Sequence, residues 1–150
     1  MNLVEYEIMA EVEEEHWWYR GLRALITMYV ERYLDSDAVR ILDVGCGTGT
    51  NLSLMDGFGT AFGVDLYDEA LRLTQSRGIE SLVRGDALRL PYADASFDVV
   101  LLMDVLYHRD VPEKAAPLRE ISRVLKPGGI VLLNVPAYPW LMSAHDVAVH

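Results

Sequence analysis

A glycine-rich segment around residue 45 constrains the fold of this chain more than any other feature of its sequence. Residues 41–50 read Ile-Leu-Asp-Val-Gly-Cys-Gly-Thr-Gly-Thr, so an apolar run ends at three alternating glycines and a helical pattern follows. Glycine adopts positive φ angles and lets a ligand approach the backbone, because it carries no Cβ. A strand, a glycine turn and a helix in this order are typical of ligand-binding α/β units. A tight turn that needs only flexibility is the alternative.

Strand and helix patterns alternate along the rest of the chain. Short apolar runs predict strands at 39–44, 60–64, 79–83, 97–103 and 130–135, and helical patterns lie at 68–77 and 117–125. The last two strands are apolar throughout, as expected when both faces of a strand are buried. Such alternation requires crossover connections between parallel strands. We therefore predict an α/β fold: a Rossmann-like, doubly wound, mainly parallel sheet of about five strands.

The residues before the first strand have a different character. We expect residues 1–38 to form an N-terminal helical extension or lid, and residues 39–150 to form the α/β domain. Apolar side chains recur there at the spacing of one helical face. They are Leu22, Leu25, Ile26, Tyr29, Val30, Tyr33 and Leu34. An acidic stretch and an aromatic run at 16–20 precede this stripe.

Charge and composition exclude several classes of partner. The 150 residues include 23 acidic and 13 basic side chains, which gives a formal net charge of −10. Such a field repels nucleic acids and anionic membrane surfaces, so neither is expected as a partner. The N-terminus lacks the pattern of a signal peptide, and no apolar run approaches the ~20 residues that span a bilayer. A single cysteine, Cys46, forms no internal disulfide, and we expect a cytoplasmic protein.

Acidic residues follow the predicted strands at the edge where the glycine turn lies. Asp65 ends the second strand, 16 residues after Gly49, and Asp86 follows the third strand. Open α/β sheets bind ligands at the carboxyl ends of their strands, where a carboxylate can accept both hydroxyls of a ribose. The alternative for Asp65 is a helix cap, a role for which Asp68 is better placed.

Two classes of cofactor compete for such a site. Dinucleotides favour Gly-x-Gly-x-x-Gly, because the pyrophosphate lies at the N-terminus of the following helix. This chain has Gly-x-Gly-x-Gly instead, with Asp43 just before the turn. A carboxylate there repels two phosphates but suits a ligand that carries an ammonium and a sulfonium. Electrostatics therefore favours S-adenosylmethionine (SAM) over a nicotinamide dinucleotide.

The sequence resembles the class I SAM-dependent methyltransferases, particularly the small-molecule branch similar to ubiquinone and menaquinone C-methyltransferases. The segments that carry this resemblance are 41–50, 63–65, 85–100 and 118–129. The resemblance implies a methyltransferase that binds SAM, releases S-adenosylhomocysteine and methylates a small-molecule substrate not identified by the sequence. A SAM-binding module without activity is the first alternative, and an NAD-dependent oxidoreductase is a less favoured one.

The resemblance also implies roles for individual residues. Asp43 and the turn residues Gly45, Cys46, Gly47 and Gly49 would hold the methionyl part of SAM, with Cys46 only a small residue that the turn tolerates. The other implied cofactor contacts are Asp65 to the ribose, Leu66 beside the adenine, Asp86 and Ala87 at the adenine edge, and Asp104 near the transferable methyl group.

Further candidates lie on either side of this set. Tyr107 and His108 would face the substrate, and His108 is the catalytic candidate if the acceptor needs a general base; a plain lining role is the alternative. Arg20 or Arg23 would meet the SAM carboxylate from the N-terminal extension. In the alternative interpretation, Trp17 and Trp18 simply anchor the first helix against the sheet.

The chain departs from the family pattern at its C-terminal end. The complete family fold has seven strands, and this sequence has no residues for the last two, so we expect a truncated chain that lacks them. The strand at 130–135 would then be an exposed apolar edge, which favours a homo-oligomer formed through that edge or by exchange of the C-terminal tail. His145 and His150 lack supporting ligands, and no metal site is predicted.

Overall fold

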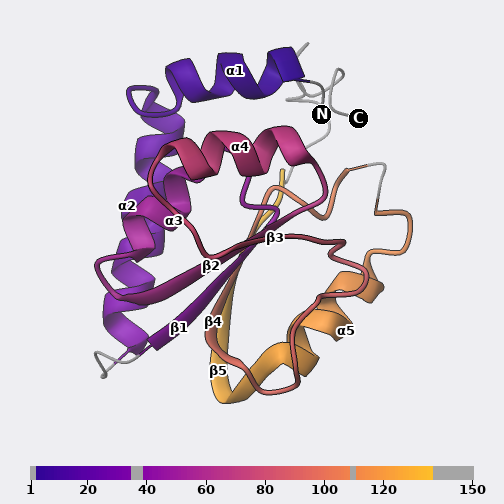
Figure 1. Cartoon of the computed structure of the whole chain (residues 1–150). Coiled ribbons are helices and arrows are strands. Elements are labelled where there is room, and N and C mark those ends of the chain that lie inside the picture. The colour runs from indigo at the N-terminus through magenta and orange to yellow at the C-terminus, as the bar shows by residue number, and fades with distance from the viewer. Residues whose placement is uncertain (1–2, 35–38, 109–110, 137–150) are drawn as a thin grey trace.

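The predicted parallel sheet is present in the computed structural model, which describes residues 3–34, 39–108 and 111–136 (Figure 1). The five strands are all parallel and lie in the order β3-β2-β1-β4-β5. Their bounds are Val39–Val44 for β1, Gly59–Asp65 for β2, Leu82–Arg84 for β3, Phe97–Met103 for β4 and Leu125–Asn134 for β5. The Rossmann-like class predicted from the alternating pattern is therefore confirmed.

Helices cover both faces of the sheet. They are α1 (Leu3–Val12), α2 (Trp17–Tyr33), α3 (Thr50–Met55), α4 (Asp68–Ser76) and α5 (Ala115–Val124). Alternate side chains of a strand point to opposite faces. Leu42 and Val100 accordingly pack with Ile121 of α5, whereas Ile41 and Val99 belong to a second cluster that contains buried residues of α2. Figure 1 shows α2 and α3 on one side of the sheet and α5 on the other.

Strand β1 lies at the point where the order of the strands reverses. It pairs with β2 on one side and with β4 on the other, so Asp43 is level with both Gly63 and Leu101. The loops that follow β1, β2 and β4 therefore emerge together at one edge of the sheet. This is the edge at which open α/β sheets bind ligands.

Strand β5 differs from its prediction in two ways. It begins at Leu125 rather than at residue 130, and a register irregularity opposite Phe97 and Val99 accommodates the added residues. The expectation that both of its faces are buried is wrong, because Val131 and Leu133 are 42% and 47% exposed. The same expectation is confirmed for β4, which lies inside the sheet. An uninterrupted apolar run thus does not distinguish an edge strand from a central one.

The N-terminal region forms two helices, and only part of its apolar stripe enters the core. Ile26 and Val30 of α2 are buried against the sheet, whereas Leu25 is exposed. Trp17 and Trp18 are 74% and 48% exposed and contact each other edge to face, so they do not anchor α2 against the sheet. No helix within the described residues is long and apolar enough to cross a bilayer.

Candidate functional site

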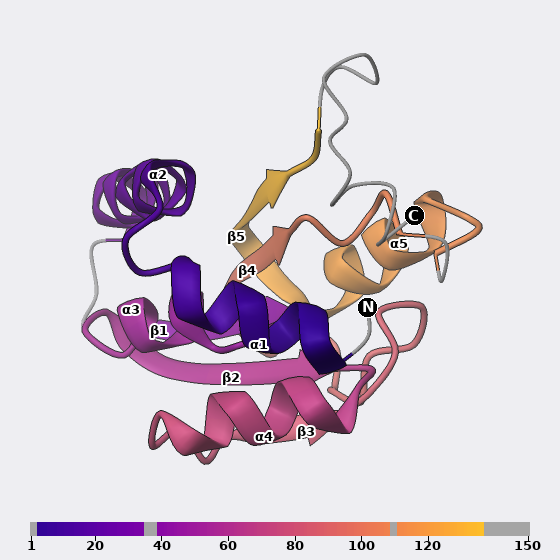
Figure 2. The ribbon, with the colours of Figure 1, turned by 90° about the horizontal axis from the view of Figure 1, so that it is seen from above.

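A cavity of about 200 Å³ lies at the carboxyl ends of β1, β2 and β4, where the sequence predicts the site. Its walls come from the glycine turn after β1, the loops after β2, β3 and β4, and the two N-terminal helices. In Figure 2, α1 extends across this end of the molecule, over β2 and beside α4. The cavity therefore joins segments that are far apart in the sequence.

The glycine turn is fixed by close packing as well as by hydrogen bonds. Gly45 has a φ of +75°, and a Cβ placed on it would lie 2.4 Å from Cγ2 of Val105. An L side chain is therefore excluded at Gly45 by both its backbone conformation and its neighbour. The backbone amides of Gly45 and Cys46 both donate to the carbonyl oxygen of Val64, at 2.8 and 3.1 Å. The turn is thus held against both β2 and the loop after β4.

Asp65 connects the end of β2 to this turn. Its Oδ2 accepts a hydrogen bond from the Gly47 amide at 3.0 Å, and its Oδ1 accepts one from the Tyr67 amide at 3.0 Å. The side chain lines the cavity although only 5% of the residue is exposed. Burial raises the pKa of Asp65, and the amide hydrogen bonds oppose this shift.

The N-cap residue of α4 is neither Asp65 nor Asp68, the two candidates from the sequence. Tyr67 is the N-cap residue and has no side-chain capping bond. Asp68 is the first residue of the helix and forms an exposed ion pair with Arg84, at 3.0 Å. The prediction that Asp68 caps this helix is therefore wrong, and Asp65 reaches the helix only by accepting from the Tyr67 amide.

Asp43 lies beneath the turn and is not among the residues that line the cavity. It is 1% exposed, and within the described part of the chain neither of its carboxylate oxygens has a hydrogen-bond partner. Burial raises the pKa of Asp43 to about 7, and the charge of Asp65 adds to the shift. A buried carboxyl group of this kind is stabilised when positive charge comes near it.

Most of the other predicted cofactor residues come together around the cavity. Those that line it are Gly45, Cys46, Gly47, Asp65, Leu66, Asp86, Ala87 and Asp104. Gly49 does not; it is the N-cap of α3, and its φ of +83° and its contact with Thr74 explain why glycine is present there. Cys46 is buried, and burial raises the pKa of its thiol, which keeps the sulfur protonated.

The loop that carries Asp86 and Ala87 is held in place by α5. Arg123 donates to the carbonyl oxygens of Leu90 and Tyr92 at 3.0 and 2.7 Å, and Glu120 accepts from the Leu90 amide at 2.8 Å. Asp86 Oδ1 accepts from the Leu88 amide at 2.8 Å, which closes the loop locally. The wall on this side of the cavity is therefore well supported.

The loop after β4 supplies the opposite wall. Asp104 has a φ of +58°, a conformation that aspartate tolerates better than most residues. Its Oδ1 accepts from the side-chain amide of Asn134 in β5 at 2.8 Å. The rings of Tyr107 and His108 stack with centroids 4.8 Å apart, and both residues line the cavity. The structure thus brings the predicted catalytic candidate, His108, to the same cavity as the cofactor residues.

The N-terminal helices supply Arg23, which the sequence offered as a candidate, together with residues that the sequence did not assign to the site. Tyr6, Met9 and Glu13 come from α1 and the turn after it. From α2, Tyr19 and Arg23 line the cavity, whereas Arg20 is exposed and does not. The spacing of residues 6, 9 and 13 is that of one helical face, and this pattern was available in the sequence.

The charges around the cavity test which cofactor fits it. Asp65, Asp86 and Asp104 line it, and Asp43 lies just below. Arg23 is the lining arginine, and within the described residues its guanidinium forms no ion pair with a carboxylate. Carboxylates accept hydroxyl and ammonium groups, and an arginine binds a carboxylate. The site therefore fits an amino-acid nucleoside such as SAM and is unfavourable for a pyrophosphate.

Comparisons with known proteins agree with this geometry. A family model described as "Methyltransferase domain" matches residues 42–133, more than half of the chain. Ubiquinone biosynthesis O-methyltransferase of Xanthomonas oryzae pv. oryzae is 36% identical over 133 residues, covering 79% of this chain and 55% of that protein. Demethylmenaquinone methyltransferase of Staphylococcus aureus is 38% identical over 111 residues, covering 69% of this chain and 45% of that protein.

A solved structure extends the likeness to the fold. A SAM-dependent methyltransferase from Methanosarcina mazei superposes with a TM-score of 0.60 at 28% identity, covering 69% of this chain and 54% of that one. The present chain spans about half the length of the curated relatives it matches.

The raised pKa of Asp43 predicts how stability depends on pH. The folded protein binds this proton more tightly than the unfolded chain, so the stability from Asp43 is present at about pH 4 and is lost as pH rises to about 7. The loss is at most about 4 kcal/mol, since one pKa unit corresponds to ~1.4 kcal/mol. Urea unfolding at pH 5 and pH 8 measures the part of this loss that falls above pH 5, about 3 kcal/mol. Asp43→Asn should remove most of this pH dependence, and Asp56→Asn, on an exposed side chain, should leave it unchanged.

Proposed function

The chain belongs to the methyltransferase domain family, and on that premise we propose that its cavity binds SAM and that the protein transfers a methyl group to a small-molecule acceptor. The single observation that supports this most is the placement of Asp65, Asp86, Asp104 and Arg23 around one cavity beside the glycine turn. S-adenosylhomocysteine is the corresponding product. The −10 net charge and the single cysteine support a cytoplasmic location without nucleic-acid or membrane partners.

Individual residues have separate tasks in this proposal. SAM supplies a methyl group already activated on a sulfonium, so this chain needs no nucleophile of its own. Asp65 accepts the ribose hydroxyls, Arg23 binds the carboxylate of the amino-acid part, and Asp86 and Ala87 face the adenine edge. Asp43 acts from beneath the turn, where its negative charge favours a cation above it. The protein then has to align the acceptor with the methyl group and exclude water.

The acceptor enters from the side of Asp104, Tyr107 and His108. His108 takes a proton only if the acceptor is a hydroxyl or a protonated nitrogen; for a carbon acceptor it lines the site. The names of the two curated relatives refer to ubiquinone biosynthesis and to demethylmenaquinone. We carry over methylation of a small molecule from them, and we leave the acceptor open.

Calorimetric titration tests the cofactor. SAM and S-adenosylhomocysteine should bind and NAD should not, because the carboxylates repel its phosphates. Asp65→Ala should weaken S-adenosylhomocysteine binding by roughly 100-fold, since two hydrogen bonds to a charged group are lost. Asp68→Ala, three residues away on an exposed side chain, should change it less than about twofold.

Binding of NAD with no binding of S-adenosylhomocysteine would overturn the proposal. Binding of S-adenosylhomocysteine without methyl release from labelled SAM, over a panel of phenolic and quinol acceptors, would instead favour the SAM-binding module without activity.

The choice between the two arginines is tested with a pair of ligands. Arg23→Met should lower the affinity for S-adenosylhomocysteine by roughly 10- to 100-fold, because a charged hydrogen-bonded pair is lost. It should leave 5′-methylthioadenosine, which lacks the amino-acid part, unaffected. Arg20→Met serves as the control, because that side chain is exposed outside the cavity. Equal losses for both ligands would show that Arg23 acts on the shape of the cavity and not on the carboxylate.

We also propose that two copies of this chain associate through β5. This strand lies at one edge of the described sheet, and its exposed Val131 and Leu133 form part of an apolar surface. Light scattering at high protein concentration should detect association, and Leu133→Lys should abolish it because a charge on an edge strand opposes pairing. A stable monomer at high concentration would contradict the proposal. The predicted exchange of the C-terminal tail and the pair His145 and His150 lie outside the described residues.

A further inference from the structure

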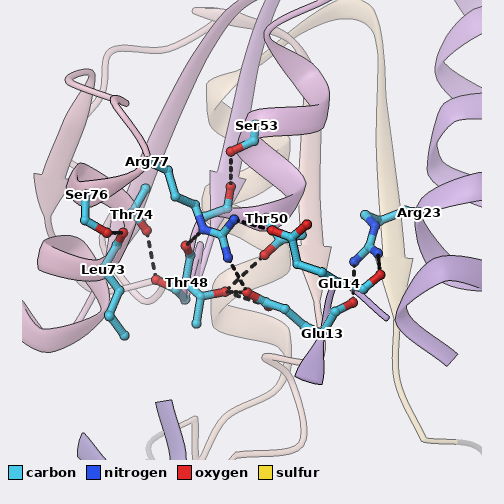
Figure 3. A network of polar contacts seen from close by, with 12 residues as sticks. Glu13, Glu14, Arg23, Thr48, Thr50, Ser53, Leu73, Thr74, Ser76 and Arg77 are labelled. Carbon is cyan, nitrogen blue, oxygen red and sulfur yellow. Dashed lines mark hydrogen bonds and ion pairs between the residues drawn. The ribbon is translucent and has the colours of Figure 1, made fainter. Parts of the chain in front are cut away.

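The carboxylate of Glu13 connects the end of α1 to the glycine turn by hydrogen bonds from Thr48 and to the end of α4 by an ion pair with Arg77 (Figure 3). Glu13 follows α1 directly and is 4% exposed. The hydroxyl of Thr48 donates to both of its carboxylate oxygens, at 2.7 and 2.6 Å. Arg77 Nη2 lies 2.7 Å from Glu13 Oε1, with only 23% of the arginine side chain exposed. Glu13 is thus hydrogen-bonded directly to Thr48 in the middle of the glycine turn.

Thr48 is held through its backbone as well as its side chain. Arg77, at the C-cap of α4, donates from Nε to the Thr48 carbonyl oxygen at 2.8 Å. Its Nη1 pairs with Glu14 at 2.7 Å, but that carboxylate is 60% exposed. The two pairs of Arg77 therefore differ mainly in burial. The buried one is expected to contribute far more to the position of α1 than the exposed one.

The same short segment is also bound from inside the cavity. Arg23 donates to the carbonyl oxygens of Glu13 and Glu14, at 2.8 and 3.0 Å. Arg23 lines the cavity and is the residue to which the carboxylate of SAM is assigned above. A ligand bound at Arg23 would therefore lie beside the segment that carries the Glu13 contacts.

Among the α1 side chains that the structure describes, few apolar groups are buried. Tyr6 is buried, with its ring 6.3 Å from that of Tyr67, but Ile8 and Val12 are 54% and 42% exposed. Tyr6 and Met9 nevertheless line the cavity and form part of its roof. A helix with few buried apolar contacts opens readily unless another interaction holds it. For α1 that interaction is the set of polar contacts at Glu13.

We propose that α1 is a lid over the cofactor cavity and that Glu13 is the positioning residue that sets how often this lid opens. Entry of SAM and release of its product then require the Glu13 contacts to Thr48 and Arg77 to break. Bound ligand, held at Arg23, favours the closed lid. The part of this inference that concerns ligand exchange rests on the proposed function, whereas the fastening of α1 does not.

Hydrogen exchange on the full chain without ligand tests the fastening itself. Glu13→Gln keeps the shape of the side chain but removes the charge that pairs with Arg77. Amides of residues 6–12 should then exchange about tenfold faster, while those of β1 and β4 stay unchanged. Glu14→Gln is the matched control on the exposed pair, and it should change exchange less than twofold. Unchanged exchange of α1 in Glu13→Gln would overturn the proposal.

Stopped-flow binding of S-adenosylhomocysteine tests the gating. If the lid limits exchange, Glu13→Gln should raise both the association and the dissociation rate constants by about tenfold, so that Kd changes little. A faster dissociation with an unchanged association rate would show that Glu13 only shapes the turn, and it would overturn the lid. If S-adenosylhomocysteine binds neither protein, the proposed cofactor is wrong and the exchange data alone decide whether α1 is fastened.

A second variant covers the case in which Glu13→Gln does not fold. Thr48→Val removes the hydroxyl that Glu13 accepts from and keeps the size of the side chain. The α1 amides should again exchange faster, but by a smaller factor than in Glu13→Gln, because the ion pair between Glu13 and Arg77 remains. A folded Thr48→Val protein with unchanged α1 exchange would contradict the role given to these contacts.

Discussion

The close approach between the glycine turn and the loop after β4 is the constraint on which the rest of the site depends. Gly45 lies against Val105 with no room for a Cβ, and it does so because β1 and β4 are neighbours in the sheet. This contact brings two walls of the cavity together at the reversal of strand order. Asp65 then bonds to the same turn from the other side of β1. The positions of the glycine turn and of the loops after β2 and β4 follow from that arrangement.

Two buried carboxyl groups, those of Asp43 and Asp65, lie next to the closely packed glycine turn. Asp43 has no hydrogen-bond partner within the described residues, and Asp65 accepts two backbone amides. An uncompensated buried carboxyl group weakens a fold at neutral pH, because the charged form is poorly solvated. The cost is balanced when a cation is bound nearby. The proposed preference for a cationic ligand and the lower stability expected of the ligand-free protein would therefore have the same origin, the buried carboxyl group of Asp43.

The sequence predicted the parts of the structure that local patterns determine. The glycine turn, the aspartates at the strand ends and five strands are encoded by adjacent residues and are present, although β3 lies at Leu82–Arg84 instead of 79–83 and β5 begins at Leu125 instead of 130. The edge position of β5 was expected, but the exposure of Val131 and Leu133 was not, since an apolar run does not report the number of covering helices. An N-terminal extension or lid was expected, but Tyr6 and Met9 of α1 were not identified as lining residues, because they reach the cavity only through tertiary contacts.

Two hydrogen bonds between Asp104 and Asn134 connect β5, at the edge of the described sheet, to a residue that lines the cavity. Asn134 is the last residue of β5, and it receives the Asp104 amide on its carbonyl oxygen while its own side chain donates to the Asp104 carboxylate. A second strand paired with the β5 edge, as proposed above, would lie directly beside the residue that holds Asp104 through these two hydrogen bonds. In the proposed dimer, this asparagine would therefore connect the paired edge of the sheet with the proposed site of methyl transfer.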